Sequence, residues 1–340
     1  MIGAGDISDY HANGYKESEN ARIMAYCDLK IELAEQKAKK FGAVSFYDSV
    51  DKLLKDPRVE AVDIAVPNKF HSEIAVKACE SGKHVMLEKP MAKNVEECNA
   101  IIRAAQKAGV NLMIDHSLMF FPPFAHCKKL LDDGKIGKII RTRAVHMGYR
   151  YFGWRADPEI TGGGVLIEGC VHPIYLSQWF LGPLVEVSAM IGKSDPEIQS
   201  EDIVMILLKG KEGGFGVIDS NLGGPFPLWD DHLELVGSEG MIIANGAEQQ
   251  ILRGPPLLHF RDGTWTAYRE RTFSDPRFPE FPNEIEWNWS KVFVYSTREF
   301  VSSIRENRKP RVTGEDGRRI IEIVEACYKS ARTGQSVNIA

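Results

Sequence analysis

The 340-residue sequence has no paired-cysteine motif and no apolar run long enough to cross a membrane. Its six cysteines are scattered without a Cys-x-x-Cys spacing, which argues against a zinc knuckle and against a disulfide framework. We expect buried thiols in a reducing cytoplasm. Internal repeats and low-complexity segments are absent as well.

An excess of positive charge is also missing. The sequence has 42 Lys and Arg residues against 47 Asp and Glu residues, which gives a net charge of -5 and a pI near 6.0. Such a protein has no field that attracts nucleic acid or an anionic membrane surface. The length is sufficient for two domains with separate cores. We therefore expect a two-domain globular protein that binds neither nucleic acid nor membrane.

A glycine motif opens the chain, with Gly3 and Gly5 followed by a small residue, Ser8. In dinucleotide-binding domains the first glycine forms a tight turn, the second lets the backbone approach the pyrophosphate, and the small residue lets helix pack on strand. We assign cofactor contacts to this turn and to the start of the next helix, at Gly3, Gly5, Asp6 and Ile7. Only two residues precede Gly3, too few for a central strand of about five, so we expect further residues upstream of Met1.

An acidic residue follows the second predicted strand, which runs from Arg22 to Cys27 and ends at Asp28. A carboxylate about 20 residues past the glycines accepts the ribose hydroxyls of NAD and repels the 2'-phosphate of NADP. Asp28 therefore favours NAD. Lys30, two residues later, is a cation that suits a phosphate and leaves NADP as an alternative.

Helices and strands alternate in the first part of the chain, as in a parallel sheet built from βαβ units. Helices are predicted at 31–41, 49–56, 71–81 and 95–108, and strands at 61–66, 84–88 and 111–115. Ligands bind outside the carboxyl ends of such strands. Pro67, Asn68 and Lys89 follow strand ends and are therefore ligand-contact candidates. A helix cap is the alternative role for Asn68, and an ordinary surface position is the alternative for Lys89.

The pattern changes after residue 120. A helix at 124–133 and a strand at 139–147 lead to alternating segments typical of an antiparallel sheet, at 185–190, 203–208, 216–220, 232–236 and 241–244. Helices at 289–305 and 316–331 close the chain. We expect an α/β Rossmann-type parallel-sheet domain at 1–120, followed by an α+β domain with a large, mostly antiparallel open sheet at 121–340.

A helix that is apolar over most of its surface is predicted from Gly162 to Trp179. Glu168 and His172 lie four residues apart, which places them on one face. A carboxylate beside an imidazole raises its pKa and fixes its tautomer, which suits proton exchange near neutral pH. A structural pair in the core is the alternative. A metal ion would need another ligand such as His116, and we expect no metal site.

Taken in order, these motifs resemble the glucose-fructose oxidoreductase and inositol dehydrogenase (Gfo/Idh/MocA) family of NAD(P)-dependent oxidoreductases. The resemblance covers essentially the whole chain and rests on Gly3-Ala4-Gly5 with His11, Pro67-Asn68 with His71, Glu88-Lys89-Pro90, Trp154-Arg155, Gly162-Gly163-Gly164, Glu168 with His172, Trp179 with Gly182, and Gly314-Glu315-Asp316-Gly317-Arg318. It implies a Rossmann domain and a second domain whose open sheet forms an oligomer interface. We expect a homodimer or homotetramer.

The resemblance also implies residue roles. It places Lys89 and His172 beside the nicotinamide, and it adds His71 and Glu88 to the cofactor contacts. The substrate candidates are Trp154, Arg155, His116 and Tyr175. Relatives generally carry aspartate at the place of Glu168, and often aspartate at Tyr175 and arginine at Met119. These departures leave the chemistry intact and the substrate open.

The implied reaction is hydride transfer between a secondary alcohol of a sugar, cyclitol or sugar derivative and NAD. In this hypothesis His172 exchanges the hydroxyl proton, Lys89 donates a hydrogen bond to the reacting oxygen, and Glu168 orients His172. One alternative is a glycosidase that uses tightly held NAD for transient oxidation and elimination. The other is a non-catalytic regulator that binds dinucleotide.

Overall fold

The computed structural model describes residues 1–148, 151–222, 230–245, 257–261, 264–268 and 291–339. The chain forms two compact units, Met1–Ser117 with Ser290–Ile321, and Leu118–Trp289 with Glu322–Ala340. The expected boundary near residue 120 lies close to the first division. The expected range 121–340 differs from the second unit, because residues 290–321 pack with the first.

This difference has a physical cause in the packing of two distant helices. Helix α10 (Lys291–Arg305) packs against α1 (Ile7–Lys16). The ring of Phe293 lies 5.2 Å from that of Tyr10 and 5.3 Å from that of His11, measured between centroids. Contacts of this kind between residues almost 300 positions apart leave no local pattern in the sequence. The Trp289 start predicted for this helix lies outside the described residues.

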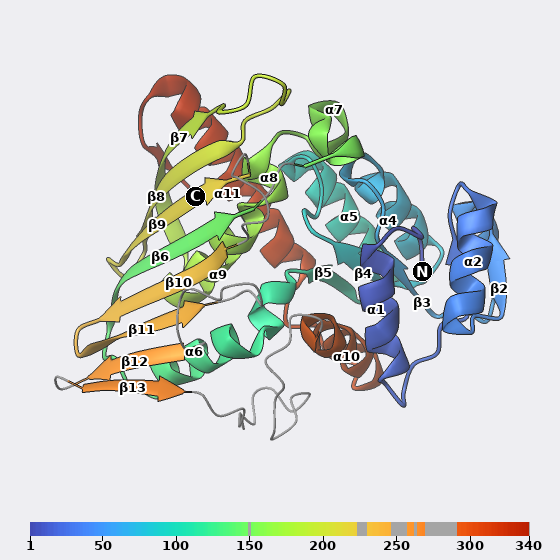
Figure 1. The fold of residues 1–340 in the computed structure, drawn as a ribbon. Helices are drawn as coiled ribbons and strands as arrows, with labels where there is room; N and C mark the ends of the chain where they lie inside the picture. Colours follow the sequence, from blue (N-terminus) through green and yellow to red (C-terminus); the bar gives the residue numbers. More distant parts are fainter. Residues whose placement is uncertain (149–150, 223–229, 246–256, 262–263, 269–290, 340) are drawn as a thin grey trace. The chain divides into compact units, whose positions relative to one another are not determined.

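The first unit contains the expected parallel sheet (Figure 1). Strands β1 (Ala25–Cys27) and β2 (Ser45–Tyr47) pair with each other, and β3 (Ala61–Ile64), β4 (His84–Glu88) and β5 (Leu112–Asp115) form a second group. Ile2 bridges both Cys27 and Ile64 and thereby joins the two groups. The amino group of Met1 is buried and donates to the carbonyl oxygen of Ala25. The expectation of residues upstream of Met1 stays a prediction.

Helices α2 (Ile31–Phe41), α3 (Val50–Leu54), α4 (His71–Glu80) and α5 (Val95–Ala108) connect these strands, and the short helix η1 (Asn68–Phe70) precedes α4. Their ends follow local signals. Asn94 caps α5 by accepting the N–H of Glu97, and Gly109 ends it in the left-handed conformation. Two strand predictions were inaccurate: residues 22–24 lie outside β1, and β2 was missed.

The second unit contains a nine-stranded sheet in the order β13-β12-β11-β10-β6-β9-β8-β7-β14. Among the described strands of this sheet, only β6 and β9 pair in parallel, so the expected mostly antiparallel sheet is confirmed. The strands are β6 (Ile139–Met147), β7 (Leu184–Gly192), β8 (Ile203–Gly210), β9 (Phe215–Asn221), β10 (Asp230–Gly237), β11 (Gly240–Asn245), β12 (Leu257–Arg261), β13 (Thr264–Tyr268) and β14 (Val337–Asn338).

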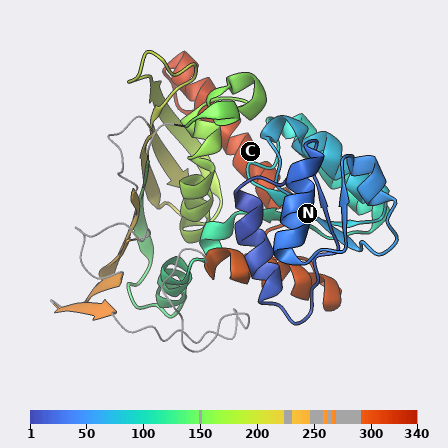
Figure 2. The same cartoon turned by 45° about the vertical axis from the view of Figure 1, so that its right-hand side comes forward.

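Helices cover one face of this sheet. Helix α9 (Val171–Leu181) packs on β6 and β9, and α6 (Pro122–Asp132) packs on β11, as the turned view in Figure 2 shows for α9. The second unit also takes the end of α11 (Gly314–Thr333), where Ser330 accepts the N–H of Ala189. Along β8, burial alternates: Val204 and Ile206 are buried, and Met205 and Leu207 are exposed. The period of two matches a sheet with one covered face.

The single helix expected from Gly162 to Trp179 is wrong. The structure has two helices in this region, α8 (Val165–Glu168) and α9, after the short helices η3 (Gly153–Ala156) and α7 (Pro158–Thr161). The break between α8 and α9 falls at Gly169, which lies against the His146 ring. A Cβ atom at Gly169 would lie 2.9 Å from His146 Cδ2, so a larger residue there would require the ring to shift. The four-residue spacing therefore does not place Glu168 and His172 on one continuous helix.

Within the described ranges, no helix combines the length and apolar character that a bilayer crossing requires.

Candidate active site

The glycine turn at the start of the first unit has the geometry of a dinucleotide-binding turn. Gly3 has φ 96°, and a Cβ atom there would lie 2.2 Å from the carbonyl oxygen of Ala65. No side chain fits this position. At Gly5 a Cβ atom would meet nothing within 4 Å, which leaves room for a ligand to approach the backbone. Ser8 is fully buried, as expected for the small residue where helix packs on strand.

Asp28 lies beside this turn. Its carboxylate accepts the backbone N–H of Ala4 at 2.9 Å through one oxygen and that of Lys30 at 2.9 Å through the other. The two bonds fix the carboxylate where β1 ends, next to the glycine turn. Asp6 precedes α1 and is exposed, and Ile7 begins α1. These residues fit the pyrophosphate and ribose of a dinucleotide.

Two loops that follow β3 and β4 are held together by His71. Its Nδ1 lies 2.8 Å from the carbonyl oxygen of Pro90, and its Nε2 lies 2.8 Å from that of Val66. Carbonyl oxygens only accept, so a ring nitrogen donates to its carbonyl oxygen only when it carries a proton. Pro67 and Asn68 lie in the first of these loops, where Asn68 is buried and begins η1. The cofactor-contact roles of Pro67, Asn68 and His71 stay predictions.

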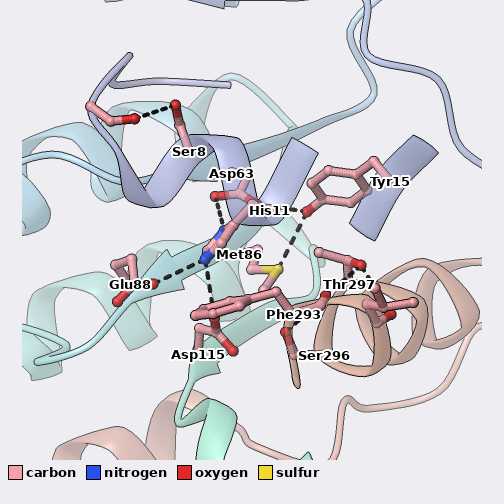
Figure 3. A network of polar contacts seen from close by, with 12 residues as sticks. Ser8, His11, Tyr15, Asp63, Met86, Glu88, Asp115, Phe293, Ser296 and Thr297 are labelled. Atoms are coloured by element: carbon pink, nitrogen blue, oxygen red, sulfur yellow. Dashed lines mark hydrogen bonds and ion pairs between the residues drawn. The ribbon is translucent and has the colours of Figure 1, made fainter. Parts of the chain in front are cut away.

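A buried histidine beneath the strand ends organises a polar network (Figure 3). The His11 Nδ1 atom lies 2.9 Å from an oxygen of Asp63, which also accepts the hydroxyl of Tyr15. The His11 Nε2 atom lies 3.0 Å from Glu88 Oε1 and 3.3 Å from Asp115 Oδ2. One imidazole ring therefore joins α1 to the parallel strands β3, β4 and β5.

The network carries charge although it is buried. Burial opposes a charged ring, but the Asp63 carboxylate and the hydrogen bonds to Asp115, Asp63 and Glu88 raise the pKa of His11 well above its ordinary value. Burial also raises the pKa of Asp115 to about 6, and the protonated His11 ring opposes this rise. Three carboxyl groups thus face one imidazolium.

Lys89 follows directly after this network. Its backbone N–H donates to Glu88 Oε2 at 3.1 Å, and the Lys89–Pro90 peptide bond is cis. Glu88 and Asp115 are register partners on β4 and β5, so Lys89 and His116 follow neighbouring strand ends. Burial and the charge of Lys89 lower the pKa of His116 to about 3. A neutral imidazole and a cationic amine therefore share the carboxyl edge of the sheet.

The second unit places Glu168 near the predicted substrate residues. Arg155 Nε lies 3.7 Å from Glu168 Oε2, and the Arg155 guanidinium lies 4.6 Å from the centroid of the Trp154 ring. Glu168 is almost fully buried, and Arg155 is half exposed. Burial and the charge of Glu168 raise the pKa of Tyr151. The structure therefore brings Trp154, Arg155 and Glu168 together within the second unit.

A second histidine, His146, lies beside His172 and was not identified as a site residue from the sequence. The rings of His146 and His172 are 5.9 Å apart between centroids. His146 Nδ1 lies 2.6 Å from Asp231 Oδ1, and both side chains are buried. These two residues are directly opposite on the antiparallel strands β6 and β10. The alternation of buried and exposed residues along each strand was the available signal. It could not show that the two residues are neighbours, because that depends on which strands pair.

Tyr175 and Met119, two positions at which relatives often carry charged residues, touch each other. The Tyr175 hydroxyl donates to Met119 Sδ at 3.4 Å, and both side chains are buried. The pair is neutral. Tyr175 stays a substrate candidate.

Metal ligation was considered for Glu168, His172 and His116. Among the described residues, the group whose ligand atoms all lie within 4.8 Å of one another is a different one, formed by His11, Glu88 and Asp115. Its hydrogen-bond distances and the raised pKa of His11 fit a ring that holds protons on both nitrogens. A doubly protonated ring has no lone pair to offer a cation.

The parallel sheet, the glycine turn with Asp28, and Lys89 at the carboxyl edge define a dinucleotide-dependent oxidoreductase class. Family comparison identifies it further. Residues 1–116 match the model of an oxidoreductase family with an NAD-binding Rossmann fold, and residues 128–339 match the C-terminal alpha/beta domain of the same family. The chain belongs to the Gfo/Idh/MocA oxidoreductase family and binds NAD through its first unit.

Curated relatives match over most of the chain. Levoglucosan dehydrogenase of Pseudarthrobacter phenanthrenivorans is 31% identical over 91% of this chain and 87% of its own length. Myo-inositol 2-dehydrogenase of Thermotoga maritima is 24% identical over 100% of this chain and 97% of its own. A solved levoglucosan dehydrogenase in complex with NADH has the same fold, with a TM-score of 0.90 at 23% identity over 100% of this chain and 98% of that one.

Lys89 belongs to the first unit and His172 to the second. That the amine and the imidazole meet over one nicotinamide ring stays a prediction.

Proposed function

We propose that this protein is an NAD-dependent dehydrogenase or reductase that acts on a secondary alcohol of a sugar, cyclitol or sugar derivative. The observation that carries the proposal is the carboxyl edge of the parallel sheet, where the cationic Lys89 adjoins the neutral His116. Ligands of such sheets bind at this edge. The curated relatives that act on inositol and levoglucosan support the substrate class.

In this proposal the cofactor is held by the glycine turn and by Asp28. Gly3 and Gly5 bring backbone close to the pyrophosphate, and the Asp28 carboxylate accepts the ribose hydroxyls. The bonds from Ala4 and Lys30 hold that carboxylate in place. Bound NAD supplies the hydride acceptor at C4 of its nicotinamide ring.

Proton transfer is assigned to side chains of the protein. His172 accepts the hydroxyl proton when the alcohol is oxidised and returns it when the carbonyl is reduced. Lys89 donates a hydrogen bond to the same oxygen and stabilises the negative charge that develops there. Glu168 orients His172, and the Arg155 guanidinium near it offers donors to substrate hydroxyls. Tyr175 and Met119 form a neutral buried pair, so neither of them would present a charge to the substrate.

A substrate screen tests this assignment. Wild-type protein is mixed with NAD and a panel of sugars and cyclitols, and reduced nicotinamide is followed by absorbance. We expect turnover with at least one polyol, a loss of about a hundredfold or more in kcat for His172→Ala and for Lys89→Met, and unchanged NAD binding by intrinsic fluorescence. Lys107→Met, an exposed lysine on α5, is the control.

Each contrary outcome has a defined meaning. Wild-type turnover in His172→Ala removes His172 from the mechanism. Release of sugar from a glycoside without net nicotinamide reduction indicates the glycosidase alternative. NAD binding without turnover of any polyol or glycoside indicates the regulator.

We further propose a homodimer or homotetramer formed through the uncovered face of the nine-stranded sheet. Met190 and Met205 are register partners there and are 77% and 54% exposed, and Leu207 and Phe215 on the same face are 58% and 57% exposed. A contiguous apolar surface of this kind favours association. Light scattering after gel filtration should show an oligomer that Leu207→Lys dissociates, whereas Leu29→Lys, at an 88% exposed leucine of the first unit, should not change it. A monomeric wild type contradicts this part.

We also propose that the protein works in the cytoplasm. All six cysteines are free and buried, as is usual in a reducing compartment. Thiol titration of protein unfolded without reductant should find six free thiols, and disulfide-bonded protein from native cells would contradict the proposal.

A further inference from the structure

We propose that His11 is a positioning residue for Lys89 and acts on it through Glu88. The inference rests on the proposed function, because it assigns Lys89 a role in the reaction. It adds a residue on the first helix, remote in sequence, to the machinery of that site.

The connection is a chain of two hydrogen bonds. His11 Nε2 donates to Glu88 Oε1 at 3.0 Å, and the backbone N–H of Lys89 donates to Glu88 Oε2 at 3.1 Å. The two bonds engage both oxygens and fix the plane of the carboxylate. The peptide that carries Lys89 is thus tied to the His11 ring, which is fully buried and held from the other side by Asp63.

The ring also supplies the positive charge of the network. Asp63, Glu88 and Asp115 face the ring from three neighbouring strands. Without the ring charge, these buried carboxyl groups would lack their cation, and uncompensated buried charge is strongly unfavourable. Lys89 follows Glu88 directly, and its charge already reaches His116. A neutral side chain at position 11 would therefore draw the Lys89 ammonium toward the carboxylates and away from a substrate.

Tyr15 separates this role from a purely structural one. It lies one helical turn after His11 on the same face of α1, is buried, and donates to Asp63 in the same network (Figure 3). Its hydroxyl donates to Asp63 Oδ2 and to Met86 Sδ, which both lie outside the path from His11 through Glu88 to Lys89. Tyr15→Phe thus perturbs the network with no direct effect on the path from His11 to Lys89.

The experiment is a double-mutant cycle on kcat with His11→Gln and Glu88→Gln, and with Tyr15→Phe as control. We expect His11→Gln to lower kcat at least about tenfold with NAD affinity changed less than about threefold. In the Glu88→Gln background the same substitution should change kcat by less than about twofold, because residues that act in one path are not additive. Tyr15→Phe should lower the melting temperature and leave kcat near wild type.

The pH profile gives a readout that a structural role would not produce. The groups around Lys89 in this network are His11 from α1, Asp63 from β3, Glu88 from β4, and Asp115 with His116 from β5. Removing the ring charge in His11→Gln should favour positive charge near Glu88 and move the alkaline limb of kcat/KM to higher pH. Removing a negative charge in Glu88→Gln should move it to lower pH.

Several results would overturn the proposal: additive effects in the cycle, equal loss of kcat in Tyr15→Phe, or shifts of the same sign in both variants. If His11→Gln does not fold, Glu88→Gln alone must show the loss of kcat and the downward shift. If wild type oxidises no polyol, the proposed function fails separately. The opposite shifts can then be sought in the Lys89 amine itself by NMR of reductively ¹³C-methylated protein.

Discussion

The backbone N–H of Ala4 donates a hydrogen bond of 2.9 Å to the carboxylate of Asp28. This bond ties the acid at the end of β1 to the glycine turn, although 24 residues separate the two in the chain. The groups proposed to hold the ribose and the pyrophosphate are therefore positioned by each other. Cofactor choice should depend on this pair.

Replacing Asp28 should weaken NAD binding and reduce the ratio of NAD affinity to NADP affinity. A charged acceptor of two ribose hydroxyls contributes about 1.5–3 kcal/mol, so Asp28→Ala should lower NAD affinity about tenfold to a hundredfold. The affinity for NADP should not fall, because the repulsion of the 2'-phosphate is removed. Fluorescence titrations with both dinucleotides measure the ratio. Glu32→Gln, an exposed acid in the next helix, is the control, and an unchanged ratio in Asp28→Ala would remove Asp28 from cofactor selection.

Alanine substitutions at the two glycines of this turn should affect different properties, fold stability at Gly3 and NAD affinity at Gly5. Gly3→Ala puts a Cβ atom 2.2 Å from the Ala65 oxygen at φ 96°, so it should destabilise the fold by at least about 1–2 kcal/mol. Gly5→Ala meets no protein atom and should leave the melting temperature unchanged. It should nevertheless lower NAD affinity, since the methyl group occupies the space for the pyrophosphate. Thermal unfolding and NAD titration of both variants separate these effects, and full NAD affinity in Gly5→Ala would contradict the assignment.

Asp115 should give the stability of the protein a characteristic pH dependence. Its folded pKa of about 6 lies above the ordinary value of 3.8, so the folded state binds more protons between these values. This contribution lowers stability as pH rises from 3.8 to about 6. The Asp115→Asn variant lacks this pH-dependent contribution to stability. The free energy of unfolding of the variant minus that of wild type should rise across this range, with a slope of up to about 1.4 kcal/mol per pH unit. Urea unfolding at several pH values measures the slope.

His116 should give the stability a pH dependence of the opposite sign to that from Asp115. Its folded pKa of about 3 lies below the ordinary value of 6.5, so the unfolded state binds more protons between these values. The contribution of His116 to stability is complete above pH 6.5 and is lost as pH falls toward 3. In His116→Gln, stability relative to wild type should therefore fall as pH rises through this window. Curves of the same sign for Asp115→Asn and His116→Gln would contradict the charge assignment at this edge.

The sequence predicted those parts of the fold that depend on neighbouring residues. Helix α5 was predicted with both ends correct because Asn94 and Gly109 are local signals. The break between α8 and α9 was not predicted, and Gly169 in this break lies against the ring of His146 on another element. The same holds for the packing of α10 on α1.

The candidate site was likewise only partly predictable from the sequence. The motifs identified Lys89 and Asp28 at strand ends and paired Glu168 with His172 within a predicted helix. Their partners depend on strand order and register, which bring Glu88 opposite Asp115 and His146 opposite Asp231. Asp63, a charge inside an apolar strand, was the available sign that a buried partner such as His11 had to exist.

The most direct test of the account follows a deuterium atom. A polyol substrate found in the screen is labelled at the carbinol carbon and incubated with the protein and NAD, and the dinucleotide is analysed by mass spectrometry. The account predicts one deuterium in the reduced nicotinamide formed by the wild type. It predicts that this labelled product is lost in His172→Ala and Lys89→Met. Reduced dinucleotide without deuterium, or labelled product at the wild-type rate in both variants, would contradict it.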